Sequence, residues 1–134
     1  MKYENEVKKF LQKQDPVELA YLFGSVAIQK AGKLSDIDLA IFLDESIEKK
    51  ERFMIKLRLI SDLENILKTD RLDLVIMNDA PISLNFEIIK ANYPLFIRDK
   101  NLKVDLEHYI ISRYLDRQYY DKRCADNLIK KTAR

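Results

Sequence analysis

The chain has 134 residues, of which 47% are hydrophobic and 34% are charged, so one compact domain with a substantial core is expected. A formal net charge of +2 is too small to predict binding to nucleic acid or to a membrane surface by itself, and a single cysteine excludes an intrachain disulfide. No run approaches the roughly 18 apolar residues of a membrane span, and the first residues lack the apolar region of a signal peptide. We therefore expect a cytoplasmic protein with no membrane segment.

The first part of the chain predicts a helix and then a buried strand that ends at Gly24. An amphipathic pattern predicts the helix over residues 4–14, and a largely apolar run predicts a central strand over residues 18–23. Gly24 lets the backbone turn sharply and approach a ligand closely. Ser25 begins a short predicted helix, whose free amide groups and positive dipole end suit a triphosphate. Taken alone, this Gly-Ser pair is better explained as a tight turn with a helix cap.

Two aspartates open the next apolar run and change that interpretation. Because alternate side chains of a strand share a face, Asp36 and Asp38 point the same way, while Ile37 and Leu39 point into the core. Two carboxylates so close together repel each other unless a cation lies between them. Mg²⁺ is the expected cation, because it prefers oxygen ligands and commonly shares its coordination shell with phosphates.

A third carboxylate lies on a later predicted strand, over residues 71–77. Asp73 is the only acid of this strand, and its aliphatic residues form the opposite face. If this strand lies beside the strand of Asp38, Asp73 completes a three-carboxylate site able to hold two metal ions. Two ions about 4 Å apart would clamp the attacking and leaving oxygens of a displacement at phosphorus.

The remaining core elements are two helices and a strand. A long helix is predicted over about residues 47–68, and a shorter one over residues 82–91. The long helix carries a stripe that we expect to face the core: Phe53, Leu57, Ile60, Leu63 and Leu67. A short strand is predicted over residues 95–98, at an edge of the sheet, because Pro94 cannot donate a ladder hydrogen bond.

The tail, over about residues 102–131, predicts one long helix with two apolar stripes, a wider apolar surface than one sheet covers. One stripe comprises Leu102, Leu106 and Tyr109 or Ile110, and the other comprises Val104, His108, Ile111, Leu115 and Tyr119. Tyrosines alternate with arginines and lysines, a composition enriched at protein interfaces. Contact with a partner chain, including oligomerisation, and packing on the chain's own domain are equal alternatives. Direct nucleic-acid binding is disfavoured, because acids dilute the basic residues.

These elements predict an α/β (α+β) fold. We expect a small mixed sheet of about four strands with helices packed against it, and a long C-terminal helix. Residues 1–100 would form the core and residues 101–134 the C-terminal helix of the same domain. Neither His108 nor Cys124 has the companions that a catalytic relay or a zinc site needs, so His108 is interpreted as structural and Cys124 as a partly buried or idle thiol.

One combination of residues carries a family resemblance. Gly24-Ser25, then ten residues, then Asp36-x-Asp38, followed by the strand-borne Asp73, resembles the signature of polymerase-β-type nucleotidyltransferases. The short chain is most similar to their minimal branch, the MNT proteins, which are antitoxins of HEPN-domain ribonuclease toxins. By element order the resemblance covers about residues 5–98.

The resemblance implies both a reaction and a partner. It implies that Asp36, Asp38 and Asp73 are catalytic and bind two Mg²⁺ ions, and that Gly24 and Ser25 bind the nucleotide, ATP. The chain would then be a protein adenylyltransferase that transfers AMP to a tyrosine hydroxyl of a cognate HEPN toxin, with release of pyrophosphate. The added bulk and negative charge would switch off the ribonuclease.

Two other functions remain open at this point. The chain could be a non-catalytic antitoxin that neutralises its toxin by binding, although a pure binder has no evident need for three carboxylates. It could also be a small-molecule nucleotidyltransferase of the aminoglycoside type, although a bare core offers no separate domain to hold such an acceptor.

Overall fold

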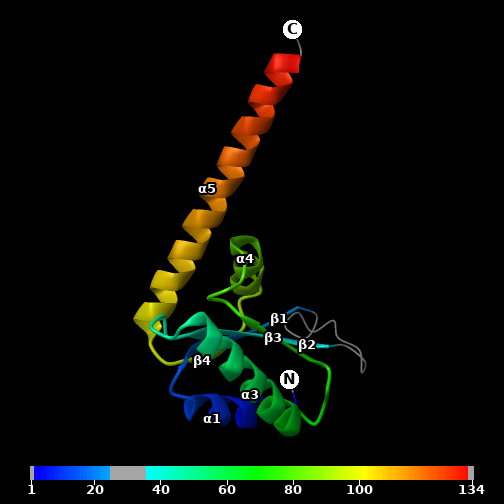
Figure 1. The fold of residues 1–134 in the computed structure, drawn as a ribbon, viewed down its shortest axis with the longest axis vertical. Coiled ribbons are helices and arrows are strands. Elements are labelled where there is room, and N and C mark those ends of the chain that lie inside the picture. The colour runs from blue at the N-terminus through cyan, green and yellow to red at the C-terminus, as the bar shows by residue number, and fades with distance from the viewer. Residues whose placement is uncertain (1, 25–35, 133–134) are drawn as a thin grey trace.

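The computed structural model describes residues 2–24 and 36–132. In chain order its elements are α1 (Glu4–Gln12), β1 (Val17–Phe23), β2 (Ile37–Leu43), α3 (Lys49–Leu67), β3 (Leu72–Ile76), α4 (Ile82–Lys90), β4 (Pro94–Ile97) and α5 (Lys100–Thr132) (Figure 1). The short helix expected to begin at Ser25 lies outside the described residues. The predicted order of the other elements is confirmed.

The strands form one mixed sheet in the order β3-β2-β1-β4. β1 pairs antiparallel with β2 and with β4, whereas β2 and β3 run parallel. β4 lies at one edge of this sheet, as Pro94 predicts, and β3 lies at the other. The mixed four-stranded sheet expected from the sequence is therefore confirmed.

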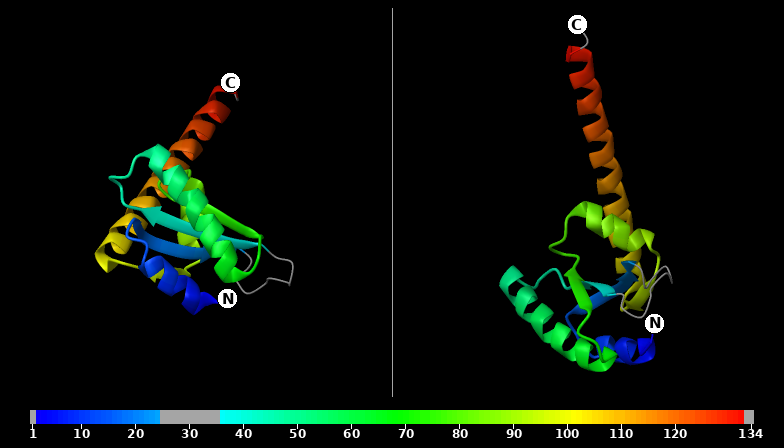
Figure 2. Two further views of the ribbon diagram at one scale, coloured as in Figure 1. Left: turned by 60° about the horizontal axis from the view of Figure 1, so that its bottom comes forward. Right: turned by 90° about the vertical axis from the view of Figure 1, so that its right-hand side faces the viewer.

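Helices cover both faces of the sheet, and each face has its own apolar cluster (Figures 1 and 2). One face packs against α1 and α3 through residues such as Val7, Leu11 and Leu59. The other packs against α4 and α5 through Ile88 and Ile110. Strands covered on both faces are apolar on both faces, which explains the nearly continuous hydrophobic runs of β1 and β2.

The stripe expected on α3 is wrong in its first half. Phe53 and Leu57 are 57% and 47% exposed, whereas Ile55 and Leu59 are buried together with Leu63 and Leu67. Both sets recur at four-residue spacing, so periodicity alone does not choose between them. The sheet contacts the face that begins at Ile55, and two large apolar side chains are left at the surface.

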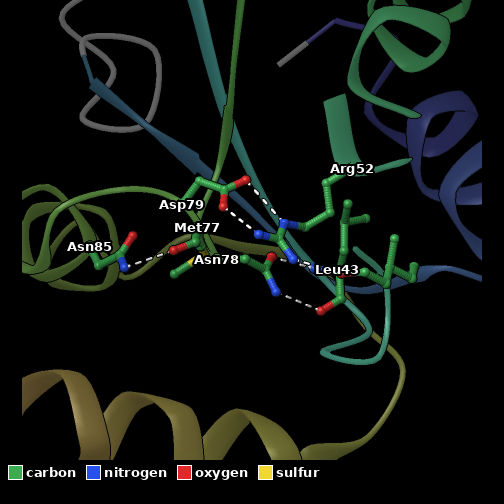
Figure 3. Close-up of polar contacts among 7 residues, drawn as sticks. Leu43, Arg52, Met77, Asn78, Asp79 and Asn85 are labelled. Carbon is green, nitrogen blue, oxygen red and sulfur yellow. Dashed lines mark hydrogen bonds and ion pairs between the residues drawn. The ribbon is translucent and has the colours of Figure 1, made fainter. Parts of the chain in front are cut away.

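Polar contacts fix the carboxyl ends of β2 and β3 (Figure 3). The Asn78 side chain bonds both backbone groups of Leu43: Oδ1 accepts from the amide and Nδ2 donates to the carbonyl, each at 2.9 Å. Beside it, Arg52 of α3 forms a bidentate pair with Asp79, with Nη2 2.6 Å from Oδ1 and Nε 3.1 Å from Oδ2. These contacts join β2, β3 and α3 at one end of the sheet.

One predicted stripe of α5, which contains Leu102, Leu106 and Ile110, packs on the sheet and is called the inner stripe here. The other, which runs from Val104 to Tyr119, does not pack on the sheet and is called the outer stripe. Leu102, Leu106 and Ile110 belong to the apolar cluster with α4, and the buried Tyr21 hydroxyl donates to Glu107 at 2.9 Å. All five residues of the outer stripe are exposed. Figure 1 shows α5 extending well beyond the sheet. No helix among the described residues is long and apolar enough to cross a membrane.

Candidate functional site

The three acids lie at the end of the sheet where β2 and β3 begin. Asp38 and Asp73 are direct partners in the parallel ladder, and Asp36 directly precedes β2. Strand alternation places Asp38 on the same face as Ala40 and Phe42, and Asp73 on the same face as Met77, all of which belong to the cluster covered by α4 and α5. Asp38 and Asp73 therefore share one face, and the expectation that their strands are adjacent is confirmed.

Gly24 brings the end of β1 against Asp38. The last residue of β1, Phe23, pairs with Asp38, and Gly24 follows with a φ of +74°. A Cβ atom at this position would lie 2.1 Å from Asp38 Oδ2, well inside van der Waals contact. Glycine is therefore required twice: for its backbone conformation and for the space taken by the carboxylate.

The electrostatics of Asp38 reflect this crowding. Burial raises the pKa of Asp38, and the negative charges of Asp73 and Asp36 raise it further. Each effect disfavours the ionised carboxylate. A positive charge placed among the three acids would favour the ionised form, which is the electrostatic condition for binding a cation.

Two hollows are lined by residues that lie close to Asp38 in the sheet. One, of about 350 Å³, is lined by Asp36 and Asp73 and by the short segment Asp70–Leu72 between α3 and β3. The other, of about 380 Å³, lies beside Gly24 and is lined mainly by α4, including Glu87 and Lys90. Nothing in the sequence selects Asp70, Glu87 or Lys90, because none of them belongs to a recognisable motif.

The donor chemistry fits a hard divalent cation, since carboxylate oxygens are the ligands that Mg²⁺ prefers. Within residues 2–24 and 36–132, however, no three acidic, histidine or cysteine side chains lie close enough together to hold a metal ion. Asp36 and Asp73 are exposed, so their carboxylates can change rotamer without unpacking the core. Ser25, the second residue expected at the nucleotide, lies outside the described residues. His108 is exposed on α5, and nothing is described of the Cys124 side chain.

Comparison with solved structures shows the same fold. A chain of the crystal structure of the toxin–antitoxin MntA–HepT is 23% identical, with a TM-score of 0.67 over 95% of this chain and 97% of that chain. A toxin–antitoxin structure with AMP-PNP is 24% identical, with a TM-score of 0.70 over 94% of this chain and 98% of that chain.

A third similar structure contains the tri-AMPylated Shewanella oneidensis HEPN toxin in complex with an MNT antitoxin. The matching chain of that structure is 23% identical to this chain, with a TM-score of 0.65 over 95% of this chain and 96% of that chain. A search of curated proteins found no match. The family model described as "Polymerase beta, Nucleotidyltransferase" matches residues 5–101, which include Gly24 and all three acids. The chain therefore belongs to the polymerase beta nucleotidyltransferase family.

Proposed function

We propose that the chain is a Mg²⁺-dependent protein adenylyltransferase that acts as an antitoxin. Its substrates would be ATP and a tyrosine hydroxyl of a HEPN-domain toxin encoded beside it. The similar toxin–antitoxin structures that contain AMP-PNP or a tri-AMPylated toxin support this choice of substrates. A reaction that uses ATP and modifies an intracellular ribonuclease would take place in the cytoplasm.

The observation that carries the proposal is the meeting of Gly24, Asp38 and Asp73 at one end of the sheet. The ladder fixes Asp38 opposite Asp73, and the missing Cβ of Gly24 leaves room for the Asp38 carboxylate. A pure binding protein has no need for a conformationally restricted glycine pressed against a partly buried carboxylate. A phosphoryl-transfer enzyme needs both, because its acids must be held in place before the charged substrate arrives.

The reaction is a displacement at the α-phosphorus of ATP. The acceptor oxygen forms the new bond to phosphorus, the bond from phosphorus to the oxygen that bridges to the β-phosphate breaks, and pyrophosphate leaves with that electron pair. Asp73, which is exposed, would receive the proton of the acceptor hydroxyl. Gly24 and Ser25 would bind the triphosphate through the backbone turn and the serine hydroxyl.

Asp36, Asp38 and Asp73 are the residues that would hold Mg²⁺. When bound, the ions would neutralise the phosphate charges and stabilise the leaving pyrophosphate. Asp38 contributes a carboxylate whose position is already restricted by Gly24 and β1. Asp36, which precedes β2, and Asp73, on β3, contribute exposed carboxylates.

The outer stripe of α5 is the surface that we propose contacts the toxin. It is exposed along its whole length, and the later part of α5 extends away from the sheet (Figure 1). Tyr114 marks the end of the packed part, because its ring stacks on Phe86 of α4 with centroids 3.8 Å apart. Leu115 and Tyr119, which follow, are 54% and 67% exposed. Large apolar side chains gathered on one exposed face are typical of an interaction surface.

The direct test uses two forms of labelled ATP. The purified chain is mixed with Mg²⁺, the toxin encoded by the neighbouring gene, and ATP labelled at either the α- or the γ-phosphate. Adenylyl transfer predicts toxin labelled from the α-phosphate and unlabelled from the γ-phosphate. Label from the γ-phosphate would instead indicate a kinase, and label from neither would contradict the proposed reaction.

The control is the double variant Asp36→Asn, Asp38→Asn, which keeps the shape of both side chains and removes their charges. Transfer that persists in this variant would contradict the role given to the acids.

The stoichiometry of inactivation distinguishes an enzyme from a non-catalytic antitoxin. An enzyme inactivates toxin when present in substoichiometric amounts, whereas a binder needs at least one copy per toxin. Modification of an aminoglycoside without any protein acceptor would favour the small-molecule alternative.

A further inference from the structure

The outer edge of β3 is not paired with another strand in the described part of the chain. β3 is the last strand of the sheet and pairs only with β2. The Ile37 amide donates to the Arg71 carbonyl, and the Met77 amide donates to the Ile41 carbonyl, each at 2.8 Å, so the backbone groups at positions 71 and 77 face β2. Because these groups alternate along a strand, those of Leu72, Leu74 and Ile76 face outward, and of these the Ile76 carbonyl already accepts from the Asp79 amide at 3.1 Å.

A groove of about 360 Å³ follows this edge. Four consecutive β3 residues, 73–76, form its floor. Lys49, Phe53 and Lys56 of α3 line one side, and the start of α4 lines the other. An extended peptide is the ligand that matches such a groove, because its own backbone can bond the outward amides and carbonyls and add a strand to the sheet.

The walls specify the side chains of that peptide. Phe53 is 57% exposed and offers an aromatic surface to an apolar residue. Lys49 and Lys56 place two positive charges on the same wall, whereas Asp79, one of the two acids that line the groove, is already paired with Arg52 (Figure 3). The preferred segment therefore carries an apolar residue facing Phe53 and an acidic residue facing the lysines.

The groove leads into the candidate active site. Asp73 lines both this groove and the hollow that contains Asp36. In paired strands, residues directly opposite each other point to the same face of the sheet. A residue opposite Asp73 would therefore project toward the face that carries Asp38 and Asp73.

We propose that the outer edge of β3 binds an extended segment of the acceptor protein as an added strand and so delivers the acceptor hydroxyl to Asp73. This inference deepens the proposed function and rests on it for the identity of the acceptor. The contact is made by the backbone amides and carbonyls of Leu72 and Leu74 and by the amide of Ile76, and the α3 wall selects the sequence of the segment.

Amide hydrogen exchange tests the added strand without requiring any transfer. The isotopically labelled chain is titrated, in the absence of nucleotide, with short synthetic peptides centred on each tyrosine of the neighbouring-gene toxin, and then with the intact toxin. We expect exchange at Leu74 and Ile76 to slow by at least about tenfold, while the amides of Asp73 and Val75, which face β2, change little. Unchanged exchange at Leu74 and Ile76 under saturation by the toxin would overturn the proposal.

Two neighbouring residues of α3 supply a matched pair of variants. Phe53 lines the groove and Met54, which is 64% exposed, does not. We expect Phe53→Glu to raise the KM for the acceptor protein about tenfold and to leave the KM for ATP unchanged, and Met54→Glu to change neither. Equal effects of the two variants would contradict the groove.

These measurements separate the docking surface from the reaction. Protected edge amides without AMP transfer would support the docking segment and contradict the proposed function. AMP transfer without protected edge amides would support the proposed function and contradict the docking segment. Protection that appears on concentrating the chain alone would identify a second copy as the occupant and overturn the choice of the acceptor.

Discussion

Asp38 and Asp73 lie directly opposite each other in the parallel β2–β3 ladder. Their side chains therefore share one face, and the negative charge of Asp73 raises the pKa of Asp38 in addition to the effect of burial. The sheet thus holds two like charges in register at the point where β1 ends against Asp38. Repulsion between these two charges destabilises the folded chain when no cation is bound. A cation bound between them would neutralise the repulsion, so the same arrangement would serve metal binding.

Asp38→Asn is expected to stabilise the fold and abolish catalysis. Because the pKa of Asp38 is raised in the folded chain, the folded state retains the proton more readily than the unfolded state, so stability falls as the pH rises from the ordinary aspartate pKa through the raised one. The variant removes that loss. Without metal, urea unfolding should show greater stability than wild type at neutral pH and no gain below the ordinary aspartate pKa.

The same variant should reduce AMP transfer by at least about 100-fold, because the residue that holds the cation loses its charge. Asp99→Asn, at an exposed aspartate before α5, is the control for a neutralised surface acid. Equal stability of Asp38→Asn and wild type at neutral pH would show that the site imposes no electrostatic strain.

Gly24→Ala is expected to destabilise the chain and displace the Asp38 carboxylate. A positive φ disfavours alanine by about 1–2 kcal/mol, and the new methyl group would also lie on Asp38 Oδ2. Chemical denaturation of Gly24→Ala, Asp38→Ala and the double variant measures how far the two positions depend on each other. In the Asp38→Ala background the steric part should disappear and the backbone part should remain. Purely additive effects would contradict the close approach.

The placement of the acids could be predicted because strand alternation is a strong local rule. Once Leu39 and Leu74 are assigned to the core, Asp38 and Asp73 must lie on the opposite faces of their strands, whatever the rest of the fold does. Only the adjacency of the two strands needed the structure. The tail helix was predicted equally well, since its two stripes are real and the inner one is buried.

The exposed face of α3, which lines the groove through Phe53, could not be predicted, and the reason is physical. Phe53 and Leu57 are as apolar as Ile55 and Leu59 and have the same spacing, so the choice between the two faces depends on how the helix lies on the sheet. The groove at β3 depends in addition on sheet order, which is set by contacts far apart in the sequence. Both features therefore appear only in three dimensions.

Asn78→Ala is expected to loosen the carboxyl end of the β2–β3 pair. The variant leaves the amide and carbonyl of the buried Leu43 without their side-chain partner, which should lower the free energy of unfolding by about 1–3 kcal/mol. Asn65→Ala, at an exposed position on α3, is the control and should change stability little. Similar unfolding curves for the two variants would show that the Asn78 contacts do not hold the strands together.

Leu115→Glu is expected to weaken the complex with the toxin without weakening the fold. Leu115 is 54% exposed on the outer stripe of α5, so a charge there disturbs no packing inside the chain but opposes burial against a partner. The dissociation constant, measured by calorimetry, should rise at least about tenfold, as expected for the loss of an anchoring apolar contact. Leu57→Glu is the matched control, because Leu57 is 47% exposed on α3 and outside both the outer stripe and the groove. If Leu115→Glu instead converts a self-associating chain to a monomer and leaves toxin binding intact, the outer stripe joins two copies of this chain, and the toxin must bind elsewhere.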